Sequence, residues 1–137
     1  MTTENNKIIA EFMIKQEPTE NFCVGSIGQE VGVFTGIKTE YFKYEDLKFH
    51  SDWNWLMEVV EKIENLPSRT LQGINYLGNE VKIYKAINTN THYCEINLVK
   101  ESGYRIVSIQ FNKESKIKSV YDACLEFIKW YNEQNKV

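Results

Sequence analysis

Apolar residues recur three to four positions apart in three stretches of the chain, a spacing that predicts amphipathic helices. A short helix is predicted over residues 4–14, and two long helices over about 51–66 and 115–132. At the start of the first long helix, Ser51 is a good N-cap and Asp52 adds negative charge to the first turn. A proline directly after residue 66 agrees with the predicted end of that helix.

Between the two long helices, strand-like runs cover residues 70–77, 80–87, 92–99 and 104–111. Gly78-Asn79 has the composition of a two-residue hairpin turn, and the other connections are also short. Short connections favour pairing of consecutive strands in an antiparallel meander. Apolar residues share one face within three of the runs: Val81, Ile83 and Ile87; Cys94, Ile96 and Leu98; Val107, Ile109 and Phe111.

The predicted fold class is therefore α+β. We expect an antiparallel meander of about four strands with the two long helices packed on one face, plus the short N-terminal helix. Residues 1–137 are expected to form a single domain. The glycine-rich stretch 22–44 predicts short irregular strands and turns, and residues 41–49 an aromatic connector that lies against the core.

Large rings outside the core stripes of the long helices suggest a contact surface. On the first long helix, the apolar arc from Trp55 to Met57, with Trp53 on the Met57 flank, spans roughly 200°, wider than one sheet contact needs. Either the aromatic connector covers one flank, or that flank is a docking surface. On the last helix, Trp130 lies roughly 140° from the stripe centre, where it is either a rim contact or part of an interface. The interface hypothesis assigns binding to Trp53, Trp55, Met57, Phe127 and Trp130.

Charge and cysteine content restrict the partners and the compartment. The formal net charge is −3 and no long block of Lys or Arg is present, so direct nucleic-acid binding is not expected. The three cysteines are too widely spaced for a disulfide framework, and Cys94 and Cys124 are expected to be buried thiols. The first residues lack a signal-peptide pattern, and apolar runs are too short for a membrane span, so a cytoplasmic location is expected.

Motifs for enzymatic chemistry are weak. The glycines match neither a phosphate-binding loop nor a dinucleotide fingerprint, and no nucleophile elbow is present. His50 and His92 have no nucleophile paired with them by sequence, and the few His and Cys residues make a zinc site improbable. No catalytic residue, metal ligand or cofactor is therefore assigned, and the chain is not expected to be an enzyme.

Three helical segments resemble a known group of proteins: residues 6–13 (NKIIAEFM), 50–64 (HSDWNWLMEVVEKIE) and 120–132 (VYDACLEFIKWYN). They look like segments of short uncharacterised proteins encoded by phages and prophages of Bacteroidota. The resemblance covers only these helix motifs and carries over no site residues. It implies an accessory protein of a mobile element that acts in the host cytoplasm.

Such proteins often inhibit host defence, so the leading hypothesis is a non-enzymatic protein that binds a host protein, such as a CRISPR effector. The alternative is a protein that sequesters a small molecule, such as a nucleotide signal, in a pocket at a subunit interface. A homodimer fits either hypothesis, and a small enzyme is the third choice.

Overall fold

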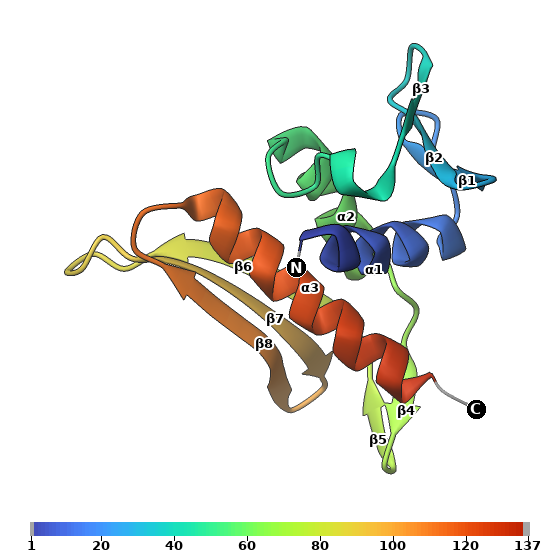
Figure 1. The fold of residues 1–137 in the computed structure, drawn as a ribbon. Helices are drawn as coiled ribbons and strands as arrows, with labels where there is room; N and C mark the ends of the chain where they lie inside the picture. The colour runs from blue at the N-terminus through green and yellow to red at the C-terminus, as the bar shows by residue number, and fades with distance from the viewer. Residues whose placement is uncertain (1, 136–137) are drawn as a thin grey trace.

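The computed structural model describes residues 2–135 and has an α+β fold (Figure 1). The described chain has three α-helices and one short 3-10 helix: α1 (Thr2–Lys15), η1 (Tyr44–Asp46), α2 (Trp53–Glu64) and α3 (Lys116–Gln134). The N-terminal helix begins at Thr2, two residues earlier than predicted. All three predicted helices are confirmed, with boundaries shifted by one or two residues.

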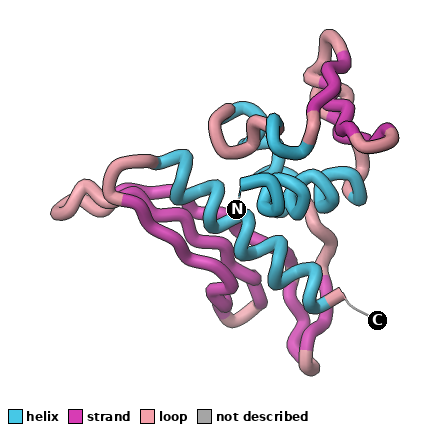
Figure 2. Tube along the Cα trace, in the orientation of Figure 1, coloured by secondary structure: helices cyan, strands magenta, loops and turns pink. Residues whose placement is uncertain are grey.

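The strands of the described residues form three antiparallel sheets. The first sheet comprises β1 (Cys23–Ile27), β2 (Glu30–Phe34) and β3 (Thr39–Phe42). The second is a hairpin of β4 (Arg69–Leu71) and β5 (Ile74–Tyr76). The third is a meander of β6 (Gly78–Lys85), β7 (His92–Lys100) and β8 (Gly103–Asn112). The β1–β3 sheet and the β4–β5 hairpin extend away from the helices at separate places (Figure 2).

The predicted four-stranded meander is wrong in its first strand. The run 70–77 is not one strand, because the chain reverses at Gln72 and Gly73, both of which have positive φ. Two successive positive φ angles are the geometry of a type I′ hairpin turn. Gly78-Asn79, predicted as a turn, instead begins β6, where Asn79 donates a hydrogen bond to the carbonyl of Ile63 at 2.8 Å.

Both long helices begin at side-chain N-caps. The side chain of Asp52 accepts hydrogen bonds from the backbone N–H groups of Asn54 and Trp55, at 2.9 and 3.3 Å. The N-cap of α2 is therefore Asp52 and not Ser51 as predicted. Helix α3 begins after Ser115, whose hydroxyl oxygen accepts from the N–H of Lys118 at 3.1 Å.

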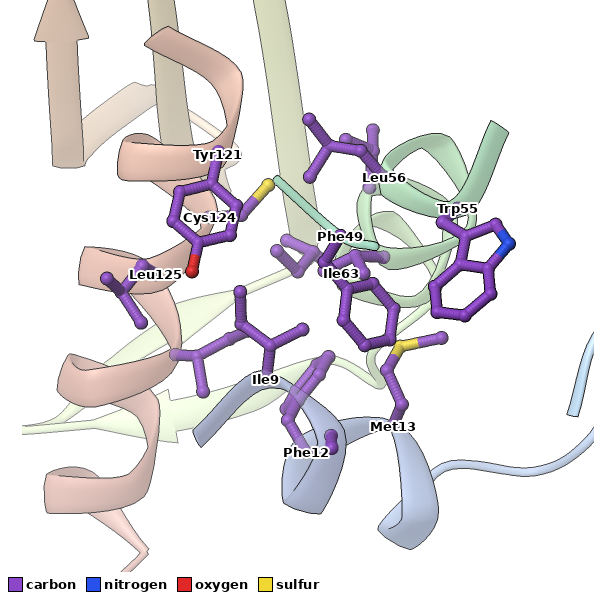
Figure 3. Packing of buried hydrophobic residues seen from close by; sticks show 14 of the residues in the cluster. Ile9, Phe12, Met13, Phe49, Trp55, Leu56, Ile63, Tyr121, Cys124 and Leu125 are labelled. Carbon is purple, nitrogen blue, oxygen red and sulfur yellow. The ribbon is translucent and has the colours of Figure 1, made fainter. Parts of the chain in front are cut away.

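The core lies where the three helices meet the inner face of the β6–β8 sheet. Helix α3 crosses β7 and β8, and α2 packs against β6 and α3 (Figure 1). Helix α1 packs on α3 as well, with the rings of Phe12 and Tyr131 edge to face at 5.8 Å. Figure 3 shows side chains from α1, α2 and α3 converging on this core. Because α1 adds a further layer, α3 is buried on two sides, and Ser119 is buried together with Tyr121 and Cys124.

Candidate binding face

Two of the five predicted interface residues belong to the core. Trp55 is only 6% exposed, and its ring makes edge contacts with Phe22, Phe42 and Phe49 at centroid distances of 6.0, 5.3 and 5.3 Å. Phe127 is 0% exposed. The expectation that these two side chains lie on an open surface is wrong. The aromatic connector covers the Trp55 flank of α2, and α3 is covered on two sides.

The other three predicted residues are half-buried and are not gathered into one patch. Trp53 lies under the ammonium of Lys116, which is 5.5 Å from its ring centre, at the start of α3. Trp130 packs against Phe127 at 5.6 Å, near the end of that helix. At about 1.5 Å per residue, these two positions on α3 are separated by roughly 21 Å. Met57 lies one helical turn after Trp53 on α2 and lines a cleft, so it is Trp130 that is separate, and the three do not define a common surface.

The cleft beside Met57 has a volume of about 600 Å³ and lies between α2 and the β1–β3 sheet. Its ionisable lining consists of Glu40, Asp52 and Glu58 against one cation, Lys48. Burial, followed by the charge of Glu61, raises the pKa of Glu58 above its ordinary value. An excess of carboxylates of this kind is unfavourable for an anionic ligand.

A second feature is the face of the β6–β8 sheet that points away from α3, which we call the outer face. The β8 strand places Ser108 toward the helix, where its hydroxyl donates to the carbonyl of Ala123 at 2.9 Å. A register shift leaves Val107 as an extra residue, because Ile96 pairs with Ser108 and Asn97 with Ile106. Ile109 and Phe111 therefore point outward and are 45% and 63% exposed. The prediction that these two residues share one face is confirmed, but that face is not the core.

The outer face is apolar along β8 and at one end of the sheet. Strand pairing places the following residues on it: Glu80, Lys82 and Tyr84 of β6; Tyr93, Glu95, Asn97 and Val99 of β7; Tyr104, Ile106, Ile109 and Phe111 of β8. At one end three rings form a row, in which Tyr84 stacks on Tyr93 at 5.3 Å and Tyr93 contacts Phe111 at 5.9 Å. Tyr104 and Ile106 extend the exposed apolar surface toward the other end of β8.

The centre of the outer face is polar and buried. The side-chain amide of Asn97 donates to Glu95 at 2.8 Å and to Glu80 at 3.4 Å, and the hydroxyl of Tyr84 donates to Glu95 at 3.3 Å. Partial burial, followed by the negative charge of Glu95, raises the pKa of Tyr84. Asn97 is 0% exposed, and its Oδ1 atom has no hydrogen-bond partner among the described residues.

The apolar pattern of β8 does not by itself reveal the outer face, because Ile109 and Phe111 share a face that the pattern cannot distinguish from the core face. The alternation along β7 contained the missing signal. Cys94, Ile96 and Leu98 define the inner face of that strand, so Tyr93 must lie on the outer face with Glu95 and Asn97. Its pairing partners Tyr84 and Phe111 follow from the register.

Comparisons with known proteins give no relative from which to transfer a site: no protein-family description, curated protein or solved structure matches the chain. Within residues 2–135, no three His, Cys, Asp or Glu side chains are grouped so that they could hold a metal ion. No helix in this described part combines the length and apolar character needed to cross a bilayer. The outer face is the candidate binding face of the described chain.

Proposed function

We propose that this chain is a non-enzymatic phage-type accessory protein that acts by binding a host protein through the outer face. A bacterial defence protein, such as a CRISPR effector, is the partner that the resemblance of the helices suggests. One observation carries the proposal: five large apolar or aromatic side chains stand at least 40% exposed on one sheet face, namely Tyr84, Tyr104, Ile106, Ile109 and Phe111.

The physical support is that an antiparallel sheet with one covered face normally presents polar residues on the other. Contiguous apolar surface of this kind is rare on monomeric proteins and marks contact sites. Tyrosine and phenylalanine are also enriched in protein interfaces, because each ring covers a large area with few rotatable bonds. A nucleotide-sequestering function has less support, since the cleft beside Met57 carries three carboxylates and one lysine.

The test is affinity capture with matched baits, followed by an activity measurement. We expect the wild-type chain to retain a host protein from a Bacteroidota lysate, and Phe111→Lys to retain much less of it. Ile87→Lys is the control, because Ile87 is 94% exposed in the turn between β6 and β7 and lies off the outer face. The captured protein is then purified, and its activity is measured with each of the three baits.

The proposal predicts inhibition by the wild type and by Ile87→Lys, and loss of inhibition by Phe111→Lys. Equal capture by all three baits would place the binding surface elsewhere. Purification of the wild type with a bound ultraviolet-absorbing ligand, and without a protein partner, would favour the small-molecule alternative.

A further inference from the structure

We propose that the outer face recognises a basic protein segment by seating one arginine side chain against Glu95, between the ring row and Asn97. This inference rests on the proposed function and names the chemistry of its partner. Two observations carry it: an acceptor without a donor at a buried position of this face, and a carboxylate beside it that has no cation at ion-pair distance.

The donor shortage is visible atom by atom. Glu95 is only 8% exposed, and its two oxygens each accept one hydrogen bond, from Tyr84 and from Asn97. The Tyr84 hydroxyl and the Asn97 amide group already donate in these bonds. The Oδ1 atom of Asn97 has no donor among the described residues. A buried acceptor without a donor is unfavourable, and most such atoms in proteins have a partner. A ligand that complements this cluster must bring donors and no acceptors, which describes a guanidinium group with its five N–H bonds.

The charge at this position is also unbalanced. Strand positions on the outer face hold two carboxylates, Glu80 and Glu95, and one cation, Lys82. The ammonium of Lys82 lies 3.8 Å from Glu80 and 5.2 Å from the ring centre of Tyr104. Within the described part of the chain, no cation lies at ion-pair distance from Glu95. A partly buried carboxylate on an open face is thus left for an incoming positive charge.

The surrounding rings suit a planar cation. Tyr84 and Tyr93 are nearly parallel, with 8° between their planes, and the hydroxyl of Tyr84 reaches Glu95. A guanidinium is planar, binds carboxylates through two N–H groups and stacks on aromatic faces, whereas an ammonium is a compact, strongly hydrated charge. Arginine therefore fits this arrangement better than lysine does.

The same charges argue against a second copy of this chain as the occupant. A two-fold axis through the centre of the outer face would bring β7 against β7 of the other copy. That arrangement places the carboxylates of the two copies close together, and like charges facing each other suppress association. A basic partner has the opposite effect, and the net charge of −3 adds long-range attraction to it.

The experiment is a nuclear magnetic resonance titration with two matched peptides. The probe is acetyl-Ile-Arg-Ile-amide, and its twin carries citrulline, which has nearly the same shape and no charge. We expect the arginine peptide to cause saturable shifts of the Asn97 side-chain amide and of the Tyr84 ring, and the twin to bind at least about fivefold more weakly. Glu95→Gln should weaken the arginine peptide to a similar degree. The control Glu101→Gln makes the same change in the turn between β7 and β8 and should leave binding of the arginine peptide unchanged.

Several results would overturn the inference: no saturable shifts with the arginine peptide, equal binding of the citrulline twin, or undiminished binding to Glu95→Gln. A dimer seen by light scattering in the wild type and lost in Phe111→Lys would show that a second copy occupies the face. If thermal melting shows that Glu95→Gln does not fold, Tyr84→Leu replaces it, with the same expected weakening.

Failure of this inference is distinct from failure of the proposed function. If the peptides do not bind but capture of a host protein still depends on Phe111, the binding function stands and the arginine assignment falls. If the arginine peptide binds but capture is the same for Phe111→Lys and Ile87→Lys, the proposed function falls.

Discussion

At the scale of single residues, Trp55 shows how a neighbouring segment decides whether a ring is core or surface. Because three phenylalanine rings enclose it, we expect Trp55→Ala to lower the free energy of unfolding by about 3–5 kcal/mol. Ile37→Ala, at a side chain that is 92% exposed, should change it by less than about 0.5 kcal/mol. Urea unfolding measures both variants. A loss below about 1 kcal/mol for Trp55→Ala would mean that the aromatic enclosure is not formed.

The buried thiols give a second prediction at this scale. Cys94 and Cys124 are both 0% exposed, as the sequence predicts. Burial raises the pKa of Cys94 from 9.0 to about 12 and that of Cys124 well above its ordinary value, each with a smaller contribution from a nearby negative charge. The folded state therefore holds these protons more tightly than the unfolded chain does. Their contribution to stability is fully present below pH 9 and is lost as the pH rises toward 12.

The variant Cys94→Ala should consequently show a shallower fall in unfolding free energy between pH 9 and pH 11 than the wild type. The slope is the quantity to compare, because the substitution also removes buried volume at every pH. Cys23→Ala is the matched control, since Cys23 is a half-buried thiol on β1. If the unfolding free energy of the wild type and of Cys94→Ala falls with the same slope above pH 9, the raised pKa of Cys94 is contradicted.

At the scale of elements, the start of α2 separates two adjacent capping candidates. Both Ser51 and Asp52 are good N-cap residues, so composition does not choose between them. In the structure, Asp52 has extended backbone angles and its carboxylate caps two N–H groups. We expect Asp52→Ala to cost about 0.5–2 kcal/mol of stability, and Ser51→Ala to cost much less. Thermal melting of the two variants checks this, and a larger effect at Ser51 would refute it.

The elements also show what the sequence could and could not predict. Helical periodicity located all three α-helices, because long stripes of apolar residues leave little ambiguity. The strand pattern failed at 70–77, where Gln72-Gly73 makes a turn that lacks the usual Asn-Gly or Asp-Gly composition. The same pattern also failed on β8, because a bulge at Val107 shifts the alternation and the helix-facing positions Ser108 and Gln110 are polar. The outer face was missed for that reason, since a shift of one residue exchanges the two faces of a strand.

At the scale of the whole molecule, one hydrophobic cluster joins parts of the chain that are far apart in sequence. It includes Val24 and Val31 of the β1–β3 sheet, all three α-helices, and Cys94 and Ile96 of β7. A hydrogen bond from the hydroxyl of Tyr121 to the side chain of Asn6, at 3.3 Å, links α3 to α1. Helix α1 thus connects the β1–β3 sheet with the helix that carries the β6–β8 sheet.

Shared burial of this kind predicts that the two larger sheets unfold together, as the expected single domain requires. Residue-resolved amide signals of β2 and β7, followed through a urea titration, should disappear with the same midpoint. Phe12→Ala removes a fully packed ring of α1, so it should lower both midpoints by the same amount and keep them coincident. A lower midpoint for β2 alone would show that the β1–β3 sheet is a separate unfolding unit. In that case the covering of Trp55 would be lost before the outer face unfolds, and binding through that face would persist in the partly unfolded chain.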